Sequence, residues 1–153
     1  MTVVTRIALA ASPARAWRAL RFYEEVEARP PLLLRALLPV PLRAEGRTFR
    51  VGDEVRCLYR TGHLVKRITR VEDGSLYAFD VVEQALPIAG GLRLRGGWYA
   101  MRSLSDGRVE VETGTRYESA RRPRWIFGRL EAAVCHRFHR HMLHAMLRDV
   151  GAS

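Results

Sequence analysis

The sequence predicts an α+β fold in which a curved antiparallel sheet of about seven strands wraps around one long C-terminal helix. Two observations support this prediction. From Arg47 to Tyr117, apolar and polar residues alternate in short segments separated by turn-forming pairs such as Asp73-Gly74, which is typical of antiparallel neighbours. From Pro123 to about Val150, the chain instead follows helical spacing without interruption.

The first part of the chain predicts one strand followed by two short helices. Val3 to Ala10 alternates as a strand, and Ser12 and Pro13 then supply a helix N-cap and a first helical residue. Prolines at positions 30, 31, 39 and 41 limit any second helix to about two turns, over Leu32 to Leu38.

Alternation within the strands also predicts which side chains face the helix. Tyr99 and Met101 lie on the opposite parity from Leu92 and Leu94, although both pairs are apolar and fit an inner face. We therefore expect a β-bulge at the Gly96-Gly97 pair, where the register shifts by one residue and the sheet bends.

The terminal helix carries an apolar ridge at every fourth position, with Phe138 and Met142 at its middle. Arg137 and Arg140 fall on the far side, where we expect them to be solvated. A cavity between this ridge and the inner face of the sheet is expected to be lined by six side chains: Tyr59, Phe79, Tyr99, Tyr117, Phe138 and Met142.

Size and composition predict one domain over residues 1–153. The chain has 153 residues, of which 48% are apolar, and this is enough for one hydrophobic core. No run reaches the ~20 apolar residues of a membrane span, and the first residues are too few and too polar for a secretory signal. We therefore expect a cytoplasmic protein. Cys57 and Cys135 lack a CxxC spacing and are expected to be reduced thiols.

The net charge of +10 raises nucleic acid as a partner class. Of the 26 basic residues only Lys66 is a lysine, which indicates a coding bias toward arginine rather than a phosphate-binding face. The arginines are dispersed, apart from Arg121, Arg122 and Arg124. We expect a solvated basic surface and no specific nucleic-acid partner.

The chain resembles the SRPBCC superfamily in three features: the order of the predicted elements, the hairpin GGWYAM…DGRVEVETGTRY and the helical segment VCHRFHRHML. This superfamily includes START domains, plant pollen-allergen proteins and polyketide cyclases, and the resemblance covers nearly the whole chain. It implies a helix-grip fold with a deep apolar cavity between the sheet and the terminal helix.

The function that these expectations favour is intracellular binding or transport of a small hydrophobic molecule, such as a lipid, a quinone or a polyketide-like ring system. A cyclase-like or dehydrase-like enzyme that uses one acid/base residue is the first alternative, so whether the protein is an enzyme stays open. The second alternative is a basic adaptor for an anionic membrane or RNA, which requires the arginines to cluster in space.

The candidates for an acid or base are His139 and His141, which flank the helical ridge, and Glu83, which continues an inner strand face. The histidines of the helix lie three apart in two pairs, rather than four apart with a glutamate between them, so we expect no metal. The sequence also lacks a phosphate-binding GK[ST] loop and a GxGxxG that opens a helix. We expect no cofactor.

Five leucines lie on the short proline-bounded segment from Ala28 to Leu42, which is too short to bury all of them on one stripe. One hypothesis is a lid over the cavity, or a patch through which Leu33 and Leu37 contact a membrane or a second subunit. The other is that all five leucines join the main core.

Overall fold

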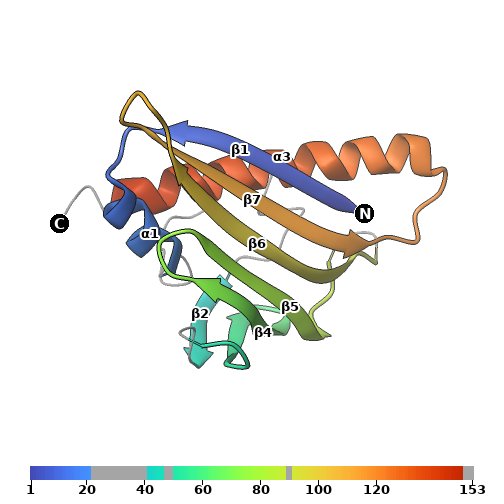
Figure 1. The fold of residues 1–153 in the computed structure, drawn as a ribbon. Coiled ribbons are helices and arrows are strands. Elements are labelled where there is room, and N and C mark those ends of the chain that lie inside the picture. Colours follow the sequence, from blue (N-terminus) through green and yellow to red (C-terminus); the bar gives the residue numbers. More distant parts are fainter. Residues whose placement is uncertain (22–40, 47–49, 89–90, 150–153) are drawn as a thin grey trace.

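The computed structural model describes residues 1–21, 41–46, 50–88 and 91–149 (Figure 1). Within these residues, seven strands form one antiparallel sheet in the order β1-β7-β6-β5-β4-β3-β2, and a long helix lies across one face. The elements are β1 (Thr2–Leu9), α1 (Pro13–Arg21), β2 (Pro41–Gly46), β3 (Glu54–Tyr59), β4 (Gly62–Glu72), β5 (Leu76–Ala85), β6 (Arg93–Ser103), β7 (Val109–Glu118) and α3 (Arg124–Asp149).

This is the predicted α+β fold, with the strands curved around a long C-terminal helix. The predicted second short helix, over Leu32 to Leu38, lies outside the described residues. So does most of the leucine-rich segment, including Leu33 and Leu37.

Helix α1 closes one end of the sheet, next to the C-terminal end of α3 (Figure 1). It begins as the sequence predicts, because the Ser12 hydroxyl accepts a hydrogen bond of 3.4 Å from the backbone N–H of Arg15. Trp17 and Leu20 on its inner side are buried. The Trp17 indole N–H also donates to Asp73 at 2.9 Å, which fixes the helix to the turn between β4 and β5.

The expected β-bulge is present, one residue before its predicted place. Leu94 pairs with Tyr117 and Gly96 pairs with Arg116, so Arg95 is the additional residue between them. Gly96 has a φ of +152°, and a Cβ there would lie 2.4 Å from the carbonyl oxygen of Phe79. A side chain would therefore clash with the neighbouring strand, which explains glycine at the point where the inner face changes parity.

The space between the sheet and α3 is divided into a packed core at the α1 end and a cavity toward the other end. The core includes Ile68 of β4, Val109 of β7 and Leu143 of α3, each at most 2% exposed. Burial of one such side chain stabilises the fold by roughly 1.5–3 kcal/mol. Strands β4, β5, β6 and β7 each contribute to both regions, so the dense core holds the walls of the cavity in place.

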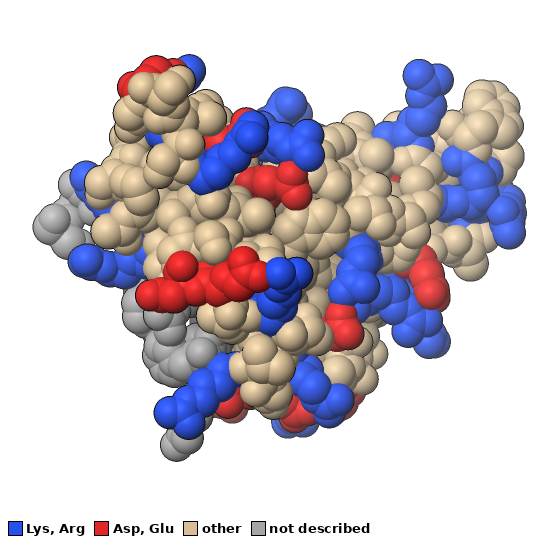
Figure 2. Space-filling view, viewed as in Figure 1, with Lys and Arg blue, Asp and Glu red and all other residues tan. Residues whose placement is uncertain are grey.

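On the outer face of the sheet, many arginines lie beside carboxylates (Figure 2). The pairs include Arg6 with Glu112 at 2.7 Å and Arg102 with Glu110 at 2.8 Å, each joining neighbouring strands. Such exposed pairs each contribute at most about 1 kcal/mol to stability. Their importance here is the charge pattern, because acidic side chains interrupt the basic ones on the face that Figure 2 shows.

Candidate ligand-binding cavity

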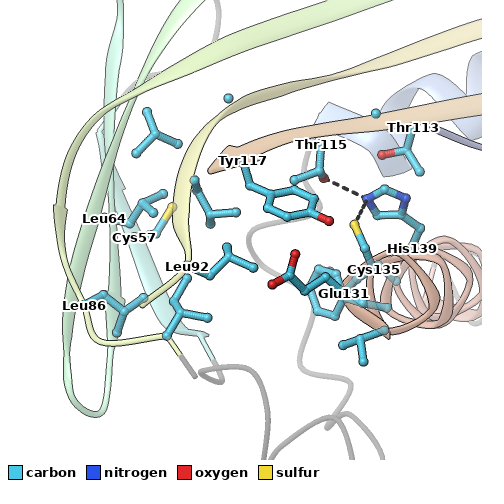
Figure 3. A pocket seen from close by; sticks show the side chains of 18 of the residues that line it. Cys57, Leu64, Leu86, Leu92, Thr113, Thr115, Tyr117, Glu131, Cys135 and His139 are labelled. Carbon is cyan, nitrogen blue, oxygen red and sulfur yellow. Dashed lines mark hydrogen bonds between the residues drawn. The ribbon is translucent and has the colours of Figure 1, made fainter. Parts of the chain in front are cut away.

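A cavity of about 430 Å³ lies between the inner face of the sheet and the first part of α3 (Figure 3). This volume falls within the range of small-molecule sites. Its wall is mainly aliphatic and aromatic, and it includes Leu64 of β4, Leu86 after β5 and Leu92 before β6. A mainly apolar wall of this kind favours an apolar occupant.

The structure places all six side chains that the sequence assigned to the cavity on its wall. Tyr59 comes from β3, Phe79 from β5, Tyr99 from β6 and Tyr117 from β7, while the remaining two, Phe138 and Met142, come from α3. Contact of these residues with a ligand stays a prediction.

His139 joins the helix to two strands at the edge of the cavity. Its Nδ1 lies 2.8 Å from the Thr5 hydroxyl on β1, and its Nε2 lies 2.8 Å from the Thr115 hydroxyl on β7. The Thr5 hydroxyl also lies 2.7 Å from Nδ1 of His136. All these contacts are satisfied when His139 Nδ1–H donates to Thr5, Thr5 donates to His136, and Thr115 donates to His139 Nε2.

This environment keeps His139 neutral. Burial, and to a smaller extent the electrostatic effect of His136, lower the pKa of His139 to about 4. Both ring nitrogens are already bonded to threonines, so the imidazole has no proton ready for a ligand at neutral pH. His139 therefore acts as a connection between α3 and the sheet.

A second polar group on the wall is formed by Tyr117 and Glu131, whose side chains point toward one another (Figure 3). Burial opposes ionisation of Glu131, but hydrogen bonds from Ser119 at 2.6 Å and Arg124 at 3.1 Å outweigh it, so its pKa is lowered. The pKa of Tyr117 is raised, first by burial and then by the charge of Glu131. The Tyr117 hydroxyl makes no hydrogen bond within the described part of the chain, so it can orient a polar atom of a ligand.

Lys66 is a cavity residue that the sequence analysis did not propose. It lies between Leu64 and Ile68 on the inner side of β4 and is only 6% exposed. Its amine lies 4.8 Å from the centre of the Phe79 ring, within range of a cation–π contact. Burial lowers the pKa of Lys66 to about 7. The sequence did contain a signal for this: alternation along β4 puts the only lysine of the chain at a position where an apolar residue is expected.

The other two acid/base candidates lie elsewhere. Glu83 is on the surface, where its half-exposed carboxylate lies 2.6 Å from Nε2 of His63. His141 is on α3 but is not part of the cavity wall. Neither reaches the space where a ligand would lie.

Neither Cys57 nor Cys135 forms a disulfide, and both line the cavity. Burial raises the pKa of Cys135 to about 11, so its thiol is protonated at neutral pH and is a weak nucleophile. Among residues 1–21, 41–46, 50–88 and 91–149, no three His, Cys, Asp or Glu side chains gather closely enough to bind a metal ion. No helix in that part of the chain is both long and apolar enough to cross a membrane.

The arrangement is a Bet v 1-like helix-grip fold, as comparison with solved structures shows. Neither a family model nor a curated protein matches the sequence. A protein from Nitrosospira multiformis is similar in fold, with a TM-score of 0.63 at 14% identity over 98% of this chain and 96% of that one.

Two further structures share the fold. Ara h 8.0201 has a TM-score of 0.63 at 12% identity, and the match covers 100% of this chain and 99% of that one. The Aha1 dimer from Colwellia psychrerythraea has a TM-score of 0.60 at 12% identity, with 98% and 96% covered. At these identities the likeness concerns the fold alone.

Proposed function

We propose that this protein binds or transports a small hydrophobic molecule, such as a lipid, a quinone or a polyketide-like ring system. The observation that carries the proposal is the cavity of about 430 Å³, which is lined mainly by apolar side chains of the sheet and α3. The Tyr117 hydroxyl on its wall gives a mainly apolar ligand one polar contact that fixes its orientation.

Three polar groups of the cavity wall are poorly suited to act as a general acid or base. His139 is neutral, and both of its ring nitrogens are engaged by threonines. Glu131 is held as a carboxylate by Ser119 and Arg124. Cys135 is protonated at neutral pH. A general acid or base works best with a pKa near the working pH and a free path to the substrate, and these three groups lack that combination.

Uptake of the neutral dye Nile red tests this proposal, because its fluorescence rises on transfer from water to an apolar site. The variant Leu92→Trp adds an indole to the cavity wall, and we expect it to weaken dye binding at least about tenfold, which is about 1.4 kcal/mol. Val82→Trp is the matched control, because Val82 is 43% exposed on β5 and lies outside the cavity.

Thermal melts of both variants accompany the dye measurements, since an added indole in a packed region can cost about 1–3 kcal/mol. Equal dye uptake by the wild type and by folded Leu92→Trp would show that the dye does not occupy the cavity. Native mass spectrometry of protein purified from its own host would then identify any small molecule that remains bound.

A further inference from the structure

Lys66 occupies a position that is unusual for a basic residue. Among the Lys and Arg residues whose side chains the structure describes, it is the only buried one. It pairs across the sheet with Val55 on β3 and with Val81 on β5, so its strand neighbours are apolar. Of the 26 Lys and Arg residues of the chain, the other 25 are arginines.

Lysine fits this position better than arginine would for a chemical reason. An ammonium group is compact, and it changes its protonation state readily when it is buried, whereas a guanidinium stays charged. Burial lowers the pKa of Lys66 to about 7, so the amine is divided between its charged and neutral forms near neutral pH. The face of the Phe79 ring, 4.8 Å away, favours the charged form.

Several other titratable side chains line the cavity with Lys66. Its titratable side chains come from β3, β6, β7, the segment before α3, and α3 itself: Cys57, Tyr59, Tyr99, Tyr117, Arg121, Glu131, Cys135 and His139. Glu131 contributes a carboxylate, which Arg124 and Ser119 hydrogen-bond. Arg121 adds positive charge.

We propose that Lys66 binds the carboxylate of the ligand, so that the cavity takes a hydrophobic carboxylic acid with its acid group directed at β4. This inference rests on the proposed function and specifies its ligand class. The net charge of +10 supports it, because a basic protein attracts anions from solution. Figure 2 shows basic side chains gathered at the end of the molecule where α3 begins, close to the first part of the cavity wall.

A carboxylate beside Lys66 favours the ammonium form, so binding raises the pKa of Lys66 above its ligand-free value of about 7. The bound state therefore takes up a proton. The gain in affinity that the contact between Lys66 and the carboxylate provides is complete below pH about 7, where the ligand-free amine is already charged. It is lost as the pH rises through the higher pKa of the complex. A neutral ligand of the same length shows no such dependence.

Dodecanoic acid and dodecanol form a matched pair that tests the proposal by displacement of Nile red. We expect the wild type to prefer the acid by at least about tenfold at pH 7, which is about 1.4 kcal/mol. Lys66→Met is expected to lose this preference. Arg67→Met is the control, since Arg67 is the next residue of β4 and lies exposed beside Glu54, outside the cavity.

A measurement on the wild type avoids reliance on a variant that fails to fold. Protein labelled with ¹⁵N-lysine gives one side-chain signal, because the chain has one lysine. We expect its titration midpoint to rise when dodecanoic acid binds and to stay unchanged with dodecanol.

Equal affinity for the acid and the alcohol, or an unmoved Lys66 midpoint in the acid complex, would overturn the role of Lys66. A preference for the acid that survives in folded Lys66→Met would overturn it too. In each of these cases binding of the dye or the alcohol would leave the proposed function intact. Failure of the wild type to bind the dye, the acid and the alcohol alike would overturn both proposals.

Discussion

The Thr5 hydroxyl lies 2.8 Å from Nδ1 of His139, although 134 residues separate the two in the chain. This hydrogen bond joins the first strand to the last helix, and Thr115 completes the connection from β7 on the other side of the imidazole. The cavity lies between α3 and the sheet. Its depth therefore depends on the distance of α3 from the sheet, which these hydrogen bonds fix.

Replacement of Thr5 by valine keeps the shape of the side chain but leaves His136 and His139 without their shared partner. We expect Thr5→Val to lower the free energy of unfolding by about 1–3 kcal/mol, because buried polar groups lose their hydrogen bonds. Urea denaturation measures this change. The control is Thr2→Val on the exposed end of the same strand, which is expected to stay within about 0.5 kcal/mol. Equal stability of both variants would contradict a structural role for Thr5.

Stability should fall in mild acid because His139 resists protonation in the folded state. Its folded pKa of about 4 is below the value of about 6.5 for an unfolded histidine, so its contribution is complete above pH about 6.5. That contribution is lost as the pH falls through about 4. We expect urea midpoints of the wild type to decrease more steeply across this range than those of His139→Gln. Parallel pH profiles for the wild type and His139→Gln would contradict this prediction.

The β-bulge should tolerate no side chain at Gly96. A Cβ there would lie 2.4 Å from the carbonyl oxygen of Phe79, a backbone atom that cannot move independently of β5. We expect Gly96→Ala to destabilise the protein by more than about 2 kcal/mol, through both the clash and the positive φ. Gly74→Ala separates these two causes, because Gly74 has a φ of +75° with open space around it. It should cost only about 1 kcal/mol.

Folding should require neither a metal ion nor a disulfide. Neither cysteine forms a disulfide, and the described residues offer no group of metal ligands. Thermal melts with and without a chelator, and with and without a reductant, are expected to give the same midpoint. A decrease of several degrees with either additive would reveal a site that the sequence and the described residues do not indicate.

The sequence by itself determined which side chains face inward. Alternation along β7 and the fourfold spacing of α3 depend only on the local geometry of strands and helices, so Tyr117 and Phe138 could be assigned to the inner side before any contact was known. The same reasoning predicted the bulge near Gly96, because two apolar pairs of opposite parity on one strand require a change of register.

Only the tertiary structure decided what these inward side chains meet. Alternation along β4 gives the inward direction of Lys66, but its burial depends on β3 and β5, which place apolar residues on both sides of it. The partners of His139 come from β1 and β7, which are distant in the chain. Local pattern sets the direction of a side chain. Its burial, its partners and its pKa depend on segments that only the folded chain brings together.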